Sequence, residues 1–487
     1  MAPVQPDATY ETIVGLEVHV RLLTNSKLFS SDANSFGKEP NSHVSPITLA
    51  HPGTLPKLNR MAVVYAVRLG LACRCDIAAQ SYFARKNYFY PDLPKGYQIS
   101  QHSAPICNGG SLVINIAGRQ KLIRIHHIHL EEDAGKSIHD LDPNHSCLDF
   151  NRAGTPLVEL VTEPDLRSGE EAHAFLVALR KLVRYLGISN GNMEEGSLRC
   201  DANISVRKKG DAQLGTRVEI KNLNSMRHVR TAVDNEALRL AMFLRDGKPV
   251  LQETRGFDAR MGQSFSLREK EEAEDYRYFP DPDLPPFRLT REFIDEIRGS
   301  IPVLEQSRVE RYRAELGLSE YDAAQLADDR PFSDYFEAIL AEGNSDAKSA
   351  ANWMLGPVRT WLNENNFDID AFPVSPAGIS RLIALVNAGQ VSHSVASSKL
   401  FAALIAEPAR DPEQIAREQY LLMRSDVAEL ESVAERVLQA FPEKVQQYRR
   451  GKKGLLAMFV GEVMKRTGGT ADPGMVNRIL LQKLNLK

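Results

Sequence analysis

Three segments in the first half of the chain alternate between apolar and polar residues. They span residues 12–22, 198–206 and 216–221. Successive side chains of a β-strand point to opposite faces of its sheet, so this period of two predicts strands with one buried and one open face. In the first segment the apolar positions are Leu16, Val18, Val20 and Leu22.

The polar positions of these segments carry carboxylates, an imidazole, guanidinium groups and an amide. They are Glu17, His19 and Arg21 in the first segment, Arg199, Asp201 and Asn203 in the second, and Glu219 and Lys221 in the third. If the three strands share one sheet, its open face is a charged platform backed by an apolar core. Antiparallel sheets allow this one-sided arrangement.

From about residue 291 the pattern becomes helical almost throughout. The proline-rich stretch 279–286 reads as a linker or boundary, and a second break falls at 407–412. We therefore expect an α+β domain with a mixed or antiparallel sheet at 1–290, a helical domain at 291–407 and a small all-α tail domain at 408–487. A chain of 487 residues is long enough for about three domains.

Composition and charge narrow the class of protein. The chain is 43% hydrophobic and 25% charged, which is ordinary for a globular protein, and its net charge of −3 excludes a wholly basic nucleic-acid coat protein. The last 46 residues, however, hold ten Lys or Arg against three Asp or Glu, which favours a polyanionic partner at that end.

The cellular compartment follows from what the chain lacks. Five cysteines favour reduced thiols over a disulfide framework. The first residues have neither a basic nor an apolar signal-peptide region, and no apolar run approaches the ~18 residues of a membrane helix. We expect a cytoplasmic protein with no membrane partner.

One group of acidic residues surrounds a histidine. Glu17 and His19 are accompanied by the segment 129–136, with Glu131 and Glu132, and by the segment 156–163, with Glu159. Mg²⁺ prefers carboxylate oxygens, and phosphoryl transfer needs a metal beside basic residues that hold phosphates. The alternative is a set of solvated strand faces and loop salt bridges.

Two basic segments do not decide between a binding role and a structural one. Aromatic residues interleave with Arg85 and Lys86 at 82–92, which suits either a nucleobase or phosphate contact or the edge of a core. The tail offers a phosphate-backbone contact or merely a solvated helix end. Its basic residues are Arg449, Arg450, Lys452, Lys453, Lys465 and Arg466.

Several common motifs are missing. The sequence has no GxxxxGK[ST] phosphate loop, no strand-linked GxGxxG and no GxSxG nucleophile elbow. The pair Cys73-x-Cys75 has no second cysteine pair nearby, which disfavours a zinc knuckle.

The chain resembles the B subunit family of aspartyl/glutamyl-tRNA(Asn/Gln) amidotransferases along essentially its whole length. The motifs that carry the resemblance are GLEVHV (15–20), ARKNYFYPDLPKGYQISQ (84–101), HLEEDAGKS (129–137), NRAGTPLVELVTEPD (151–165), MEEGSLRCDANISV (193–206), EIKNLNS (219–225), DYRYFPDPDL (275–284) and GKKGLLAMFVGEVMK (451–465).

This resemblance implies a function and a fold. Members of the family use ATP and Mg²⁺ to phosphorylate the side-chain carboxylate of Glu-tRNA(Gln) or Asp-tRNA(Asn), and ammonia then displaces phosphate to form the amide. The ammonia is released from glutamine by the A subunit, an amidase, while a small C subunit joins the two in a heterotrimer. The resemblance thus implies a ligase that forms carbon–nitrogen bonds with glutamine as amido donor, a glutamine synthetase-like first domain as catalytic cradle, and a tRNA-binding tail.

Residue roles are carried over by motif. The resemblance implies Glu17, His19 and Glu132 as catalytic metal ligands, with Glu131 and Glu159 as second choices. It implies that Lys86 stands where ammonia enters the site. ATP, its phosphates or a second metal would contact Arg199, Asp201, Asn203, Glu219 and Lys221, and tRNA would contact the six basic residues of the tail.

One departure from the family concerns zinc. Many relatives hold zinc with cysteines in two stretches that here contain Ser30, Ser31 and Asp32, and Ser45 and Thr48. Hydroxyl groups and one carboxylate do not bind Zn²⁺ tightly, so we expect no structural zinc and a region held by loop packing.

Two other functions compete with this one. A catalytically silent tRNA-binding adaptor would need only the tail and would have no use for Glu17, His19 and Glu132 together. An aminoacyl-tRNA synthetase is disfavoured because no HIGH-like or KMSKS-like segment is present.

Overall fold

The computed structural model describes residues 9–269, 276–423 and 427–485. They form two compact units, which divide after Leu304. The expectation that no signal peptide is present rests on the first residues, which lie outside the described ones. None of the described helices is both long enough and apolar enough to cross a membrane.

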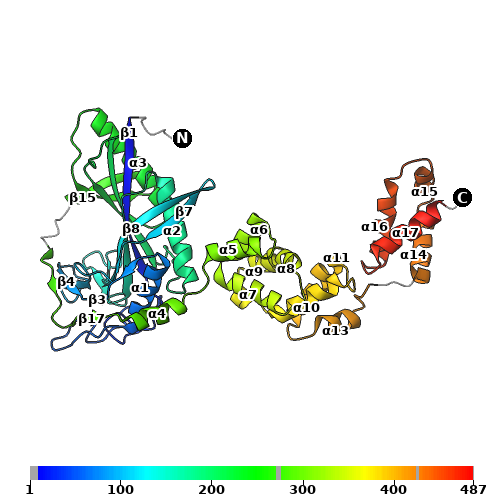
Figure 1. The fold of residues 1–487 in the computed structure, drawn as a ribbon, viewed down its shortest axis with the longest axis horizontal. Coiled ribbons are helices and arrows are strands. Elements are labelled where there is room, and N and C mark those ends of the chain that lie inside the picture. The colour runs from blue at the N-terminus through cyan, green and yellow to red at the C-terminus, as the bar shows by residue number, and fades with distance from the viewer. Residues whose placement is uncertain (1–8, 270–275, 424–426, 486–487) are drawn as a thin grey trace. The chain divides into compact units, whose positions relative to one another are not determined.

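The first unit is built on a mixed sheet, as predicted (Figure 1). Every strand pair in it is antiparallel except β13–β14, which is parallel. In spatial order the strands are β15 (Gln263–Glu269), β14 (Glu253–Asp258), β13 (Val218–Leu223), β12 (Leu198–Lys208), β1 (Tyr10–Arg21), β11 (Pro156–Thr162), β8 (Arg119–Glu132), β6 (Cys107–Asn108) and β2 (Asp76–Ile77), with β7 (Ser111–Ile116) paired to β8.

The three alternating segments are confirmed as β1, β12 and β13, which lie side by side. His19 on β1 stands opposite Arg199 on β12 and opposite Glu159 on β11. Glu159 in turn faces His129 on β8. Because directly opposed residues share a face, the polar positions of these strands form one continuous polar face.

The opposite face of the sheet is the core. Leu16, Val18 and Val20 are at most 1% exposed and join one apolar cluster with residues of three helices. Those helices are α1 (Arg60–Ala72), α2 (Gly169–Tyr185) and α3 (Met226–Arg245). The hydroxyls of Ser168 and Ser225 accept hydrogen bonds from the backbone N–H groups of Glu171 and His228 in the first turns of α2 and α3, which fixes where these helices begin.

Smaller sheets complete the first unit. They pair β4 (Ala84–Asn87) with β5 (Tyr97–Ser100) and β16 (Phe279–Pro280), β3 (Gln80–Ser81) with β17 (Phe287–Arg288), and β9 (Lys136–Ile138) with β10 (Cys147–Asp149). The stretch 279–286, predicted as a linker, is packed into the unit, because Asp281 is 4% exposed and accepts a 2.9 Å bond from Arg85. Ile297 of α4 (Arg291–Gly299) joins the same core, so the unit extends beyond residue 290 to Leu304.

The second unit is all helical, as predicted. It holds two apolar clusters, one of residues from Tyr312 to Leu421 and one of residues from Leu430 to Leu484. The boundary between a helical domain and a tail domain at 407/408 stays a prediction. The helices are α5 (Glu305–Ala314), α6 (Glu320–Ala327), α7 (Arg330–Ala341), α8 (Ala347–Trp353), η2 (Met354–Val358), α9 (Arg359–Asn365), η3 (Ile369–Ala371), α10 (Pro376–Asn387), α11 (His393–Val395), η4 (Ala396–Leu400), α12 (Phe401–Ala406), α13 (Pro412–Glu418), α14 (Val427–Ala440), α15 (Pro442–Arg449), α16 (Leu455–Arg466) and α17 (Pro473–Asn485).

Candidate active site

The polar face of the sheet opens into a cleft of about 920 Å³. His19 and Arg21 of β1, Arg199 and Asp201 of β12 and Lys221 of β13 line it. The loop at 35–38 and the segment 193–196 form other parts of its wall. A cleft of this size, lined by convergent charged groups, is large enough for a small-molecule ligand.

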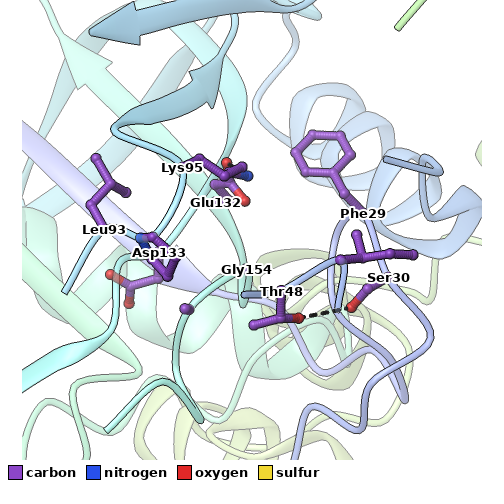
Figure 2. A pocket seen from close by; sticks show the side chains of 11 residues that line it. Phe29, Ser30, Thr48, Leu93, Lys95, Glu132, Asp133 and Gly154 are labelled. Atoms are coloured by element: carbon purple, nitrogen blue, oxygen red, sulfur yellow. Dashed lines mark hydrogen bonds and ion pairs between the residues drawn. The ribbon is translucent and has the colours of Figure 1, made fainter. Parts of the chain in front are cut away.

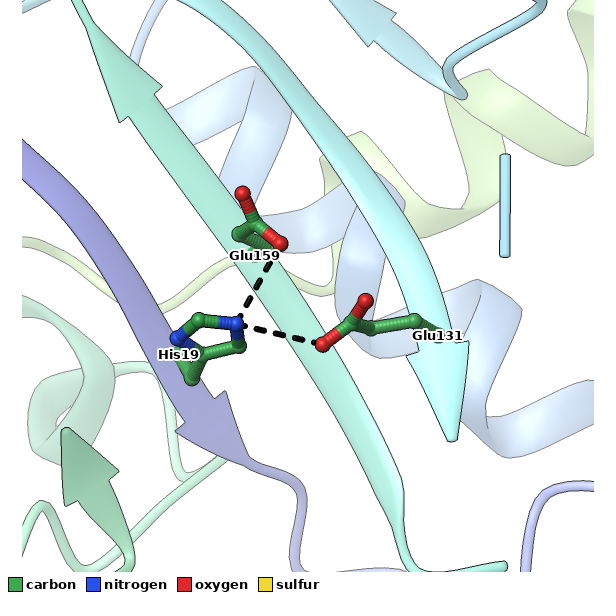
Figure 3. Close-up of side chains that lie close together, drawn as sticks. All are labelled: His19, Glu131 and Glu159. Carbon is green, nitrogen blue, oxygen red and sulfur yellow. Dashed lines mark ion pairs between the residues drawn. The ribbon is translucent and has the colours of Figure 1, made fainter. Parts of the chain in front are cut away.

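Three side chains on neighbouring strands converge in this face (Figure 3). The Nε2 atom of His19 on β1 lies 3.2 Å from a carboxylate oxygen of Glu131 on β8 and 3.2 Å from one of Glu159 on β11. One potential ligand atom from each of the three lies within 4.8 Å of the others. Sequence reasoning gave no role to His129, whose Nε2 lies 3.7 Å from Glu131 and 3.5 Å from Glu159.

Burial and charge oppose each other in this cluster. Burial alone would lower the pKa of His19, but the carboxylates of Glu159 and Glu131 outweigh it and raise that pKa well above its ordinary value. Burial likewise favours neutral carboxyl groups, yet the two imidazoles hold the pKa of Glu159 at about 2 and that of Glu131 well below its ordinary value. The cluster therefore keeps two ionised carboxylates around a positive charge.

The donor set fits a divalent cation. Two buried carboxylates and an imidazole are ligands that such an ion accepts, and a bound ion would replace the proton that now balances their charge. The Nδ1 atom of His129 is buried and, among the described residues, has no hydrogen-bond partner. Its other ring nitrogen, Nε2, is the one that faces the two carboxylates.

A second polar group lies next to the first, on β1, β12 and β13. Asn203 donates a 2.8 Å bond to Glu17, and Lys221 donates a 2.9 Å bond to Asp201. Glu219 accepts a 2.9 Å bond from Thr254 of β14 and lies 3.4 Å from the Lys221 ammonium. Burial would lower the pKa of Lys221, but Asp201 and Glu219 raise it, so this cation stays charged.

Arg199 connects the cleft to a loop residue that sequence reasoning missed. Its guanidinium donates a 2.7 Å bond to Asp133, and Asp133 also lies 3.6 Å from Arg152. All three residues line the cleft. Asp133 follows the last residue of β8, and Arg199 of β12 stands opposite His19 of β1. Only the register of the strands indicates that these residues are grouped.

The structure does not bring Glu132 to His19. Glu132 follows Glu131 on β8, so its side chain points to the other face of the sheet. There its carboxylate accepts bonds from the Lys95 ammonium and, at 3.0 Å, from the backbone N–H of Ile99. Figure 2 shows Glu132 and Lys95 together in a separate small pocket with Phe29.

Lys86 lies on a different sheet from the three-residue cluster. It belongs to β4, in the three-stranded sheet, and its ammonium stands 4.7 Å from the centroid of the Tyr276 ring and 5.9 Å from that of Tyr88. These are cation–π distances, which a basic side chain reaches beside electron-rich rings. The expected role of Lys86 in the passage of ammonia stays a prediction.

The basic residues of the tail all lie exposed in the second unit. They are Arg449, Arg450, Lys452, Lys453, Lys465 and Arg466. Three of them have close neighbours within the tail, since Arg449 donates a 3.3 Å bond to the Leu484 carbonyl, Lys453 stands 4.3 Å from the ring centroid of Tyr448 and Arg466 lies 3.5 Å from Glu462. The other face of α16 packs Phe459 and Val463 into the core, so the basic ends of this helix remain available to solvent.

The two stretches that contain Ser30 and Ser45 are organised around Asp32. One carboxylate oxygen accepts bonds from Ser45 at 2.8 Å, from Ser30 at 3.0 Å and from Thr48. Burial would raise the pKa of Asp32, but the three hydroxyls outweigh it and lower that pKa. A hydrogen-bonded carboxylate thus joins the two stretches in this region.

Comparison with known proteins agrees with the motifs. A family model described as the GatB/GatE catalytic domain matches residues 12–295, and one described as the GatB domain matches residues 334–484. Proteins named as the B subunit of aspartyl/glutamyl-tRNA(Asn/Gln) amidotransferase are similar over 98% of this chain and 99% of their own length. They include those of Persephonella marina, Anaeromyxobacter sp. (strain K) and Geotalea daltonii, at 46%, 47% and 48% identity.

The fold and the cluster together define a catalytic sheet domain joined to a helical region. The matched residues cover both parts of the chain. The chain belongs to the GatB family.

Proposed function

We propose that this chain is the component of a tRNA-dependent amidotransferase that activates and amidates the aminoacyl-tRNA. The side-chain carboxylate of Glu-tRNA(Gln) or Asp-tRNA(Asn) attacks the terminal phosphorus of ATP, and ADP leaves. Ammonia then adds to the acyl phosphate and inorganic phosphate leaves, which gives Gln-tRNA(Gln) or Asn-tRNA(Asn). The similarity to the B subunits of such enzymes over nearly the whole chain supports this assignment.

The observation that carries the proposal is the buried cluster of His19, Glu131 and Glu159 at the cleft that His19 lines. We assign the metal-binding role to these three residues, with Glu131 in place of its neighbour Glu132. A bound Mg²⁺ would neutralise the charge that builds up on the phosphates during transfer. The adaptor alternative gains no support, because an adaptor has no need of such a cluster.

The second polar group suits the phosphates. Lys221 and Arg199 are cations in the wall of the cleft, and each is at present paired with a carboxylate, Asp201 or Asp133. A triphosphate would compete for these cations, which is how a charged site exchanges internal partners for a ligand. Glu17, Asn203 and Glu219 lie beside them and would orient the phosphates or a second metal ion.

The partners follow from the same assignment. The relatives are named as B subunits, which supports a complex of several proteins. We propose that its other members are an amidase, the A subunit, together with a small protein, the C subunit. The amidase would supply ammonia past Lys86. The exposed basic residues of the tail would hold the tRNA backbone.

The test uses the assembled amidotransferase with Glu159→Gln and, as a matched control, Glu163→Gln, which removes a carboxylate just beyond the end of β11. Glu159→Gln should lower ATP hydrolysis that depends on Mg²⁺ and Glu-tRNA by at least about a hundredfold, because losses of this size follow even from changes around a metal ligand. tRNA binding should be unchanged in both variants. Full ATP hydrolysis with Glu159→Gln would overturn the assignment.

A further inference from the structure

The polar face of the sheet continues beyond the charged residues to an aromatic ring. Gly256 of β14 stands opposite Lys221 of β13 in the parallel pair, and Phe265 of β15 stands opposite Gly256. With Glu17 facing Asp201, and Asp201 bonded to Lys221, these residues form one row across five strands. The row runs from the catalytic strand to the edge of the sheet.

Phe265 lies on the open face of the sheet. The neighbouring positions Arg255 and Ser264 point the other way, because both interact with Glu236 of α3 and α3 packs on the core face. Side chains alternate along a strand, so Gly256 and Phe265 share the face of Lys221 and Glu219. Phe265 is 49% exposed, so one side of its ring is open to a ligand.

The ring lies across the neighbouring strand. A β-carbon placed on Gly256 would stand 2.5 Å from the Cζ atom of Phe265 and 2.9 and 3.0 Å from its two Cε atoms. Only glycine leaves this space, so the absence of a side chain at position 256 lets the ring extend toward Lys221. The result is an apolar floor beside a phosphate-binding cation.

The distance from the metal cluster suits a nucleotide. β14 lies three strands from β1, which at about 4.8 Å per strand is roughly 14 Å. An extended nucleoside triphosphate covers a span of this kind, with its phosphates over Lys221 and Arg199 and its base beyond them. Base stacking on an aromatic ring is favourable for any purine and needs no hydrogen-bond partner.

We propose that Phe265, lying across Gly256, is the stacking platform for the adenine of the ATP that this site uses. The inference rests on the proposed function, because it takes the phosphates to bind at Lys221. It adds a residue that determines nucleotide affinity and takes no part in phosphoryl transfer itself.

The experiment compares Phe265→Leu, Phe265→Trp and Leu267→Ala in the assembled amidotransferase. Leu267 is an equally exposed apolar residue of the same strand. Phe265→Leu should raise the KM for ATP about tenfold, the effect of losing one base–aromatic stack, and leave kcat and the KM for Glu-tRNA unchanged. Phe265→Trp should keep the KM for ATP, and its added fluorescence, measured against the unmodified complex, should be quenched by ADP. Leu267→Ala should match the unmodified complex.

Inorganic tripolyphosphate separates the base from the phosphates. As a competitive inhibitor it should be equally effective against Phe265→Leu and the unmodified complex, because it has no base to stack. Three outcomes would overturn the proposal. These are an unchanged KM for ATP in Phe265→Leu, a higher KM for the tRNA in place of ATP, or an equal weakening of ATP and tripolyphosphate, which is the result expected if the ring only shields Gly256.

A further variant, Lys221→Met, distinguishes a failure of the stacking proposal from a failure of the proposed function. If Lys221→Met weakens the binding of ATP and tripolyphosphate but Phe265→Leu weakens the binding of neither, the stacking role of Phe265 is wrong and the proposed function stands. If neither variant affects either compound, the nucleotide does not bind on this face and both fail.

Discussion

Glu131 and Glu132 are neighbours in the sequence and belong to different sites. The Glu131 carboxylate lies 3.2 Å from His19 on the open face of the sheet, whereas the Glu132 carboxylate binds Lys95 on the other face. Two adjacent glutamates of one motif thus serve separate purposes, and substitutions at the two positions should have different effects.

We expect Glu131→Gln to weaken metal binding and Glu132→Gln to weaken the fold. With Mn²⁺ as the probe, Glu131→Gln should lower the affinity at least tenfold, because one of two charged ligands is lost. Glu132→Gln should leave the affinity within about twofold, but it should lower the free energy of unfolding by about 1–3 kcal/mol, since the half-buried Lys95 ammonium loses its buried carboxylate partner. Calorimetric titration and thermal unfolding measure the two effects. A loss of metal affinity in Glu132→Gln together with a loss of stability in Glu131→Gln would contradict the separation of the two sites.

A buried lysine should make stability depend on alkaline pH. Lys27 is 0% exposed. Among the described residues, its ammonium donates hydrogen bonds only to the backbone carbonyls of His43 and Phe150. Burial lowers the pKa of Lys27 to about 8. Between pH 8 and the ordinary value of 10.5 the native protein has released this proton while the unfolded chain still holds it. Stability should therefore rise with pH across that window.

The measurement is the thermal midpoint of the unmodified protein minus that of Lys27→Met, taken from pH 7 to pH 10.5. The difference should increase above pH 8. Lys57→Met, which removes an exposed lysine of the same unit, should give a flat difference. A flat difference for Lys27→Met as well would mean that its ammonium is not penalised by burial.

The Asp32 cluster should stabilise its loops without a metal. Asp32→Ala leaves the hydroxyls of Ser30, Ser45 and Thr48 without their shared acceptor, and should lower the free energy of unfolding of the first unit by about 1–3 kcal/mol. A zinc-selective chelator should leave the thermal midpoint of the unmodified protein unchanged. A large shift on adding the chelator would show that a metal holds this region.

Reversing two charges in the tail should weaken the binding of tRNA by the same factor whatever the sequence of the tRNA. The double variant Lys452→Glu, Lys453→Glu removes two exposed cations, and the slope of log affinity against log salt concentration should fall by about one for each lost phosphate contact. The matched control reverses Lys208 and Lys209, a neighbouring exposed pair in the first unit. Equal effects of the two pairs would argue against a specific role of the tail.

Alternation along the sequence was enough to predict β1, β12 and β13 and the face that carries Glu17 and His19. The same rule applies to β8. There Ile128, Leu130 and Glu132 occupy alternate positions on one face, and His129 and Glu131 lie on the other. Two buried apolar residues in step with Glu132 indicate that it points to the core side. The motif alone favoured Glu132, whereas the period of two places Glu131 on the face of His19.

Other features depend on pairings that no local pattern encodes. The parallel contact between β13 and β14 decides that Gly256 stands beside Lys221, and the pairing of β16 with β4 brings Asp281 to Arg85. The residues 279–286 are polar and rich in proline, which is typical of a linker. Within this stretch Asp281 and Leu284 are buried, and the sequence near them contains no sign of the long-range ion pair between Asp281 and Arg85.

The central position of β1 affects how the protein is made. This strand leaves the ribosome well before its partners β11 and β12, which begin at Pro156 and Leu198. Until those segments have been synthesised, His19 has neither Glu159 nor Arg199 beside it, and the apolar side of the strand has no sheet to cover it. The His19 imidazole therefore spends the early life of each nascent chain without these partners, in a stretch of polypeptide that chaperones can meet before β11 and β12 exist.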